Sequence, residues 1–165
     1  MIGVIVLDTN VLSELMRPRP NPQVLAWVDG LDPGLVAITA MNEAEILHGI
    51  RRLPDGRRKA ALQQCWDELV ADIFAGRVWP FSSEAAHWYA DLLRTRERLA
   101  RPMATADAVI AATALAHGAQ LATGDVADFA DVGLDLINPW ASSDNAPVET
   151  PPACSAPNTR SDVPG

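Results

Sequence analysis

Four acidic residues occupy positions from which their side chains could meet in the folded chain. Asp8 directly follows the apolar run "VIVL" at 4–7, and Asp125 follows "LATG", which ends another apolar run. Asp107 stands in the first turn expected for an apolar helix, and Glu45 lies in a helix after a second strand. Taken singly, each has an ordinary explanation as a cap, loop or exposed helix residue. Because three of the four fall at the expected strand-to-helix edge, where ligands bind in such folds, together they predict one cleft.

Carboxylates gathered in one cleft repel one another, by about 4 kcal/mol for each close pair at an effective dielectric of about 20. They must therefore take up protons or bind cations. A cage of oxygen donors, with Thr9 and Asn10 nearby, suits Mg²⁺ or Mn²⁺, which keep several waters and accept phosphate oxygens as ligands. Such a site activates water and stabilises the leaving oxygen during hydrolysis of a phosphodiester bond. The pattern therefore predicts metal-dependent phosphodiester hydrolysis.

Basic residues are concentrated at 51–59 and at 94–101. The net charge of −8 argues against indiscriminate binding to polyanions, but arginines beside the cleft could hold phosphates by paired hydrogen bonds. Solvated helix faces explain either stretch equally well. The expected substrate-binding residues are Arg51, Arg52, Arg98 and Arg101.

Short apolar runs alternate with helical stretches along the chain. We expect strands at 4–7, 35–38, 77–81, 119–123 and 134–137. The first, second and fourth are apolar on both faces, as in a parallel sheet covered by helices on each side. Asn21 and Ser82 mark helix starts, and Thr105 can cap a helix that closes at Gly118. The alternation predicts an α/β fold, a three-layer α/β/α sandwich with a mainly parallel central sheet.

The chain of 165 residues fits one domain and a tail. Residues 141–165 hold five of the thirteen prolines and almost no large apolar side chain, so we expect a folded domain over 1–140 and a disordered tail over 141–165. No segment approaches the roughly 18 apolar residues that span a bilayer, and no secretory signal is visible. We therefore expect a cytoplasmic protein without membrane contact. Two cysteines outside any C-x-x-C pair give no support to a thiol-based zinc or redox site.

Several segments, in the right order, resemble a PIN-domain ribonuclease, specifically a VapC or FitB-like toxin of a bacterial type II toxin–antitoxin pair. The resemblance covers about residues 4–140. The segments that carry it are "VLDTNVLSEL", "AEILHGI", "ATADAVIAATALAHGAQLATGDVADF" and "INPW". Several matching segments are much more specific than any single acidic residue.

The resemblance implies a metal-dependent endoribonuclease that uses Mg²⁺, or Mn²⁺ in its place, and acts on RNA. It implies a homodimer and a cognate antitoxin that covers or fills the active groove. The catalytic and metal-binding residues would be Asp8, Glu45, Asp107 and Asp125. The supporting residues would be Thr9, which fixes Asp8 or a water, and Asn10, Thr123 and Asp128.

Three positions in these motifs stay open. Glu43 lies two residues before Glu45, and only the register of "AEILHGI" favours Glu45. Asp128 is the alternative to Asp125 as the fourth acid. The family often has a basic residue after the threonine of the fourth strand, whereas this chain has Gly124, so one phosphate contact would be missing.

Other enzyme classes fit the sequence less well. A phosphotransfer enzyme or receiver domain needs a lysine from a late strand, and Lys59 is the single lysine. A dinucleotide-binding domain needs a G-x-G-x-x-G after the first strand, and a di-iron site needs two Glu-x-x-His pairs, of which Glu45-x-x-His48 is one. The main alternative is a catalytically silent module that holds RNA or a peptide in the same groove, with one or two of the five tryptophans lining it.

Overall fold

The computed structural model describes residues 3–141, and within them the strands form one five-stranded, all-parallel sheet in the order β3-β2-β1-β4-β5. The strands are β1 (Ile5–Leu7), β2 (Val36–Thr39), β3 (Val78–Trp79), β4 (Gln120–Ala122) and β5 (Leu136–Ile137). All five lie at the expected places, which confirms the predicted strands. The expected tail lies, from residue 142 onward, outside the described residues, so the domain boundary stays a prediction.

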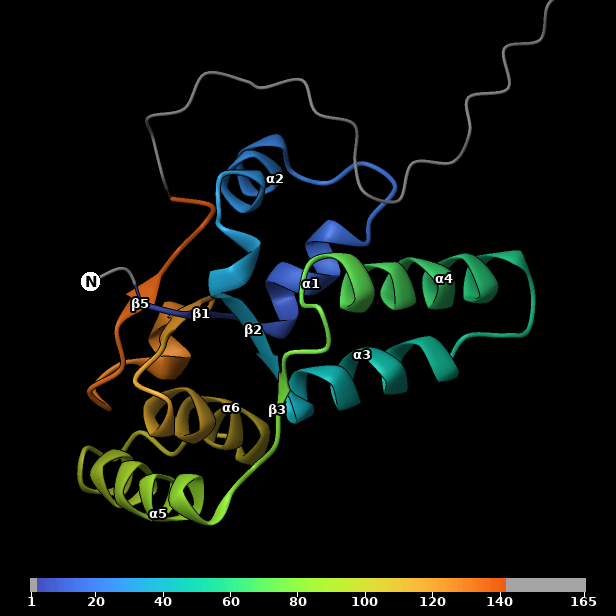
Figure 1. Cartoon of the computed structure of the whole chain (residues 1–165). Coiled ribbons are helices and arrows are strands. Elements are labelled where there is room, and N and C mark those ends of the chain that lie inside the picture. The colour runs from blue at the N-terminus through green and yellow to red at the C-terminus, as the bar shows by residue number, and fades with distance from the viewer. Residues whose placement is uncertain (1–2, 142–165) are drawn as a thin grey trace, which may run out of the picture.

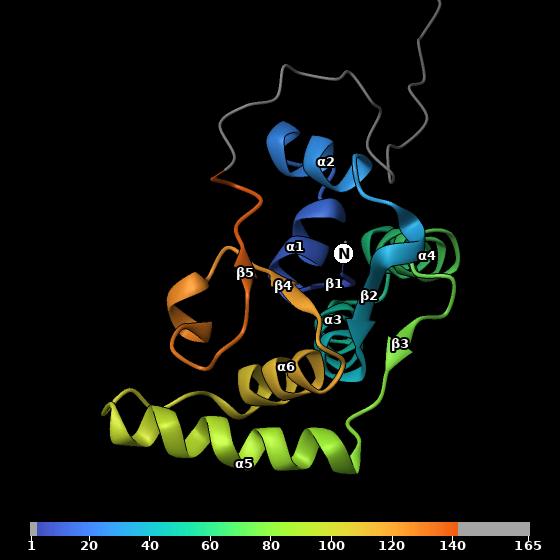
Figure 2. The same cartoon turned by 60° about the vertical axis from the view of Figure 1, so that its left-hand side comes forward.

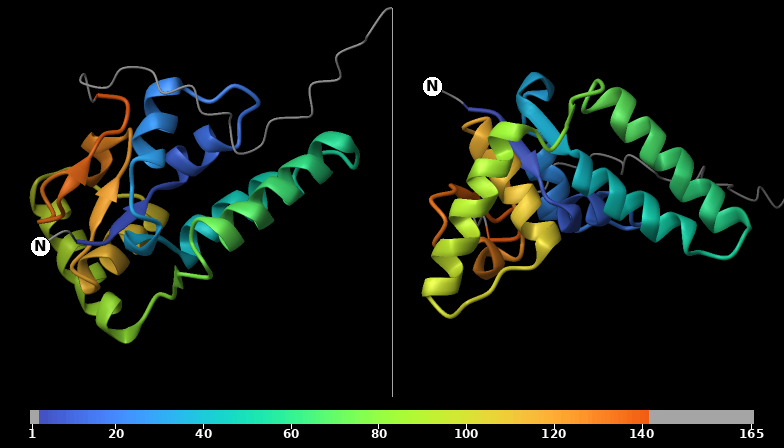
Figure 3. Two further views of the ribbon diagram at one scale, coloured as in Figure 1. Left: turned by 45° about the horizontal axis from the view of Figure 1, so that its top comes forward. Right: turned by 90° about the horizontal axis from the view of Figure 1, so that it is seen from below.

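Six α-helices of the described residues surround this sheet. They are α1 (Thr9–Leu15), α2 (Pro22–Asp29), α3 (Ala40–Arg51), α4 (Arg57–Asp72), α5 (Ser83–Arg98) and α6 (Thr105–Ala116), with short 3₁₀ helices η1 (Pro33–Leu35) and η2 (Val126–Phe129). Helices α1 and α2 lie on one side of the sheet, and α5 and α6 lie on the other (Figures 1 and 2). Helices α3 and α4 form an antiparallel hairpin that extends away from the sheet (Figure 3). None of these helices is long and apolar enough to cross a membrane.

The strand residues divide the core into two parts, as alternate side chains of a strand point to opposite faces. Ile5 and Leu7 pack with residues of α1 to α4, whereas Val6 packs with residues of α5 and α6. All three are buried. A strand covered on both faces is the reason that "VIVL" is apolar throughout, and the two core clusters confirm the predicted three layers.

Side-chain caps fix where several helices begin. Asn21 accepts from two backbone amides at the start of α2, and Ser82 accepts from the Ala85 amide at the start of α5. The expected Thr105 cap is wrong, because Thr105 is already helical and Ala104 is the capping residue, without a side-chain hydrogen bond. At the other end of α6, Gly118 has the positive φ (61°) of a left-handed helix stop, as predicted.

Candidate active site

The carboxyl ends of β1 and β4 deliver polar residues to one edge of the sheet. The two strands pair so that Leu7 lies beside Ala122, and Asp8 and Thr123 come next along the chain. The Asp8 amide continues the pairing by donating to the Ala122 carbonyl (2.9 Å). Since the strands are parallel, the residues that follow them share this edge. The strand register therefore fixes Asp8 beside Thr123.

Asp8 is a buried carboxyl group, with 5% of its surface exposed. Its Oδ1 accepts from the Thr9 amide and its Oδ2 from the Thr123 hydroxyl, both at 2.8 Å. Burial raises the pKa of Asp8 to about 6, and repulsion from Asp107 and Glu45 adds to this effect, against the two hydrogen bonds. Asp8 is also the N-cap of α1. No positively charged side chain of residues 3–141 is among the groups that shift its pKa.

A second set of hydrogen bonds orients Glu45. The Thr9 hydroxyl donates to Glu45 Oε1 (2.8 Å), and the Asn42 side-chain amide donates to the Thr9 hydroxyl (3.0 Å). Asn42 is fully buried and forms a capping box with Thr39 at the start of α3. The sequence suggested that Thr9 fixes Asp8; its amide does so, whereas its hydroxyl holds Glu45. Thr9 therefore ties the start of α1 to the start of α3.

Asp107 lies in the first turn of α6, as expected, and is half-buried. Burial raises the pKa of Asp107. Repulsion from Asp128, Glu45 and Asp125 raises this pKa further, and attraction to Arg96 opposes the rise. The acidic residues therefore act on one another electrostatically although they come from separate elements.

Asn10 connects Asp125 to the end of β4. Its Nδ2 donates to Asp125 Oδ2 (3.0 Å) and to Thr123 Oγ1 (3.1 Å), and its Oδ1 accepts from the Gly124 amide (3.3 Å). The Thr123 hydroxyl also accepts from the Asp125 amide (3.0 Å). Asp128 is exposed on η2 and does not line the cleft described next. Asp125 thus lines the cleft, whereas Asp128 acts on Asp107 from outside it, and the choice of Asp125 as the fourth acid stays a prediction.

One cleft of about 660 Å³ brings these groups together. The four predicted acids line it with Thr9 and Asn10. Its other lining residues, which the sequence did not assign to the site, are Ser13, Glu14, Arg17, Asn21 and Trp140. Positions 9, 10, 13, 14 and 17 recur at helical spacing, so this polar face of α1 was a signal available in the sequence.

Trp140 explains why a glycine follows Thr123. A Cβ atom at position 124 would lie 3.0 Å from two ring carbons of Trp140, which is tighter than ordinary van der Waals contact. A basic residue at this place, as often found in the family, would therefore require the indole ring to shift by a few tenths of an ångström.

None of the four arginines expected to bind substrate lines the cleft. Arg101 pairs with Asp131 (2.7 Å), and Arg52 and Arg98 are exposed elsewhere. Arg51 lines a separate groove of about 520 Å³ between α3 and α4. Their role in substrate binding stays a prediction that the geometry of the cleft does not support.

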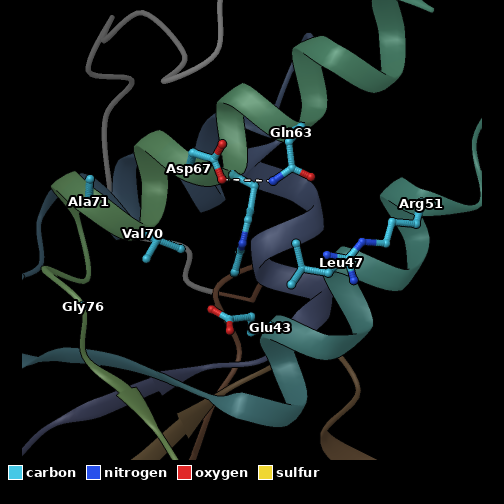
Figure 4. Close-up of a pocket in the computed structure, with 9 residues that line it drawn as sticks. Glu43, Leu47, Arg51, Gln63, Asp67, Val70, Ala71 and Gly76 are labelled. Carbon is cyan, nitrogen blue, oxygen red and sulfur yellow. Dashed lines mark hydrogen bonds between the residues drawn. The ribbon is translucent and has the colours of Figure 1, made fainter. Parts of the chain in front are cut away.

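Glu43 lines the groove between α3 and α4. Figure 4 shows Glu43 and Arg51 on α3 facing Gln63 and Asp67 on α4, which share a hydrogen bond (3.0 Å). Glu43 is therefore directed away from the cleft that Glu45 enters, in line with the preference for Glu45.

Arg96 behaves differently from its exposed neighbours in the 94–101 stretch. It is buried, and its guanidinium donates to the backbone carbonyls of Arg101 (2.7 Å), Asp128 (3.0 Å) and Ala130 (2.9 Å). These bonds fasten the end of α5 to η2. Arg96 is thus a structural residue that the charge pattern alone did not reveal.

The cleft fits a hard divalent cation by the chemistry of its donors. Its acidic side chains offer oxygen ligands, which Mg²⁺ and Mn²⁺ prefer. A cation would favour the ionised form of Asp8, whose pKa burial has raised. Within residues 3–141, no three His, Cys, Asp or Glu side chains form a compact metal-binding group. The four carboxylates line one cleft, and their mutual repulsion opposes closer approach without a cation.

Comparison with known proteins agrees with this arrangement. The PIN domain family model matches residues 5–134. The chain is 42% identical to VapC ribonuclease Y4jK of Sinorhizobium fredii over 137 residues, which cover 83% of this chain and 98% of that protein. It is 37% identical to Toxin FitB of Neisseria gonorrhoeae, with 83% and 99% covered.

Solved structures give the same result in three dimensions. The crystal structure of FitAcB from Neisseria gonorrhoeae superimposes with a TM-score of 0.79 at 37% identity, covering 84% of this chain and 100% of that one. The structure of FitAB bound to the IR36 DNA fragment gives a TM-score of 0.79 at 36% identity, with 87% and 100% covered. These matches confirm the resemblance and the fold: the chain belongs to the PIN-domain family and is a relative of its VapC and FitB toxins.

Proposed function

We propose that this chain is the toxin of a type II toxin–antitoxin pair and hydrolyses RNA phosphodiester bonds with the help of a divalent metal ion, Mg²⁺ or Mn²⁺. The relatives named VapC ribonuclease and Toxin FitB support this proposal. The observation that carries it is the cleft itself, which collects carboxyl groups from four separate segments around the buried Asp8.

The four acids of the cleft would divide this chemistry between them. Asp8 and Asp107 would hold the ion, and Glu45 and Asp125 would complete the cage or orient the attacking water. The ion, when bound, polarises the phosphoryl group and lowers the pKa of water. The protein fixes the acids in advance: Thr123 orients Asp8, Thr9 orients Glu45 and Asn10 orients Asp125.

The proposed partners follow from the relatives. The FitAB and FitAcB structures support an antitoxin as the cognate partner of this chain. We further propose that the toxin is a homodimer and meets its RNA substrate in the cytoplasm.

Expression of matched variants tests the function. Wild type should arrest growth and cleave cellular RNA, whereas Asp8→Asn and Asp107→Asn should do neither. Purified wild type should cleave RNA in Mg²⁺ or Mn²⁺ but not in EDTA, and each variant should be slower by roughly 100-fold or more, because a metal site supplies several kcal/mol of transition-state stabilisation.

Asp91→Asn is the matched control, since Asp91 is an exposed acid on α5 outside the cleft. It should remain toxic and active. Equal cleavage by all four proteins would refute the assigned site. RNA binding without cleavage by any of them would favour the silent binding module instead.

A further inference from the structure

A row of polar side chains runs along α1, away from Asp8 at its amino end. Thr9, Asn10, Ser13, Glu14 and Arg17 all line the cleft. Their spacing of three and four residues places them on one side of the helix and of the turn that ends it. At a rise of about 1.5 Å per residue, α1 advances roughly 9 Å from Thr9 to its end at Leu15, and Arg17 follows two residues later. The cleft therefore continues past the acids to a basic residue.

Arg17 is the one basic residue that lines this cleft in the described part of the chain. Its side chain is 68% exposed, and its Nε lies 3.3 Å from Glu14 Oε2. Its terminal nitrogens form no hydrogen bond within residues 3–141. A guanidinium is a planar fork, so one edge can bind a carboxylate while the terminal nitrogens bind an oxyanion. Arg17 is therefore arranged to accept an anion from the cleft.

Glu14 holds Arg17 in place. It is 8% exposed, and its Oε1 accepts from the Asn21 backbone amide (2.8 Å), which leaves Oε2 to face Arg17. Because the Arg17 side of this ion pair is largely exposed, the pair contributes little to folding stability. Its clearer effect is to restrict a long side chain before a ligand arrives, which reduces the entropy lost on binding.

We propose that Arg17 binds an RNA phosphate that flanks the reacting one, and that Glu14 is its positioning residue. This inference rests on the proposed ribonuclease function. A strand of RNA that enters an acidic cleft needs a cation beside the metal site to offset repulsion, and none of the four arginines expected from the sequence lies there. Because Arg17 follows the carboxyl end of α1 whereas Asp8 caps its amino end, Arg17 contacts a neighbouring phosphate and not the one that is hydrolysed.

The first test compares Arg17→Gln with Arg19→Gln. Arg19 is an exposed arginine two residues away that does not line the cleft, so its variant removes the same charge nearby. With an RNA that the wild type cleaves at a mapped bond, Arg17→Gln should raise KM about tenfold, as expected for a lost charge-assisted hydrogen bond, and leave kcat within about twofold. The slope of log KM against log salt should fall by about 0.7. Arg19→Gln should change neither quantity.

A second test identifies the phosphate. The same RNA is made with one uncharged methylphosphonate linkage, moved step by step past the cleaved bond. At one flanking position the neutral linkage should raise KM for the wild type and have no further effect on Arg17→Gln. Glu14→Gln should raise KM in the wild-type background and have no further effect in the Arg17→Gln background, which a merely structural role of Glu14 would not produce.

The inference and the proposed function fail separately. If the wild type cleaves RNA but Arg17→Gln matches Arg19→Gln, or lowers kcat instead of raising KM, the role of Arg17 is refuted. If the wild type cleaves no RNA, the dissociation constant of a single-stranded oligoribonucleotide in Ca²⁺ decides. A tenfold weaker affinity of Arg17→Gln alone supports phosphate binding by Arg17 while the nuclease proposal falls, and equal affinities refute both.

Discussion

Asp8 combines two roles that ordinarily belong to different residues. As the N-cap of α1 it accepts a backbone amide, and as the end of β1 it lies buried among other acids. A sequence reader can predict its position, since a carboxylate directly after a buried strand is conspicuous. Its raised pKa depends on burial and on Asp107, 99 residues later, which no local pattern contains.

Replacing Asp8 with Asn should stabilise the metal-free protein more at neutral than at acid pH. The folded pKa of about 6 exceeds the ordinary 3.8, so the folded state binds the proton more tightly than the unfolded state. In the wild type, the contribution of protonated Asp8 to the free energy of unfolding is fully present below about pH 4. It is lost as pH rises through about 6, by on the order of 3 kcal/mol. In EDTA, the Tm of Asp8→Asn minus that of wild type should rise by roughly 6–12 °C between about pH 4 and pH 7.5.

Thermal unfolding of Asp91→Asn in the same buffers provides the control, because its Tm difference from wild type should be flat across this range. A pH-independent difference for Asp8→Asn would show that Asp8 ionises as an ordinary surface carboxyl group.

At the scale of elements, helix starts do much of the positioning. The caps of α2 and α5 were predictable because Asn21 and Ser82 act within three residues of themselves. Asn42 was not predictable, because its bond to Thr9 crosses 33 residues of sequence. Its amide oxygen completes the α3 capping box while its nitrogen donates to Thr9, so one side chain serves both the helix and the site.

Asn42→Ala should therefore reduce both stability and activity. Loss of the cap and of a buried hydrogen-bond partner should lower the free energy of unfolding by about 1–3 kcal/mol. Cleavage should fall at least about tenfold, because Asn42 no longer orients the Thr9 hydroxyl that holds Glu45. Ser82→Ala removes the cap of α5, far along the chain from the cleft. It should cost about 1 kcal/mol and leave cleavage unchanged.

Both proteins would be compared by thermal unfolding and by kcat well below their Tm. Unchanged cleavage by Asn42→Ala, with reduced stability, would mean that Glu45 keeps its orientation without this network.

At the scale of the whole molecule, the parallel sheet gathers side chains that the sequence separates by more than a hundred residues. The layers were predictable from strands that are apolar on both faces. The strand order and the projecting α3–α4 hairpin were not, because they depend on how whole elements pack (Figures 2 and 3). The arginine of the cleft was missed although the polar spacing of positions 9, 10, 13, 14 and 17 pointed to it, because only the structure shows that this face lines the cleft.

A bound divalent ion should stabilise the whole domain through the same cleft. At an Mn²⁺ concentration about 100 times its dissociation constant, the gain is about 2.7 kcal/mol, or roughly 5–10 °C in Tm for a chain of this size. Differential scanning fluorimetry with and without Mn²⁺ should show this shift for wild type and for Asp91→Asn. Asp107→Asn should lose most of it, and an equal shift in all three would place the ion elsewhere.

Because all strands are parallel, their amino ends and their carboxyl ends lie at opposite sides of the sheet. β1 begins at the side where the strands have their amino ends. Trp140, almost the last described residue, lines the cleft at their carboxyl ends. A sensor chip or fluorophore attached ahead of β1 would thus leave the cleft facing free solution. The same group joined directly after residue 141 would start beside Trp140. For binding kinetics, the protein should therefore be immobilised or labelled ahead of β1.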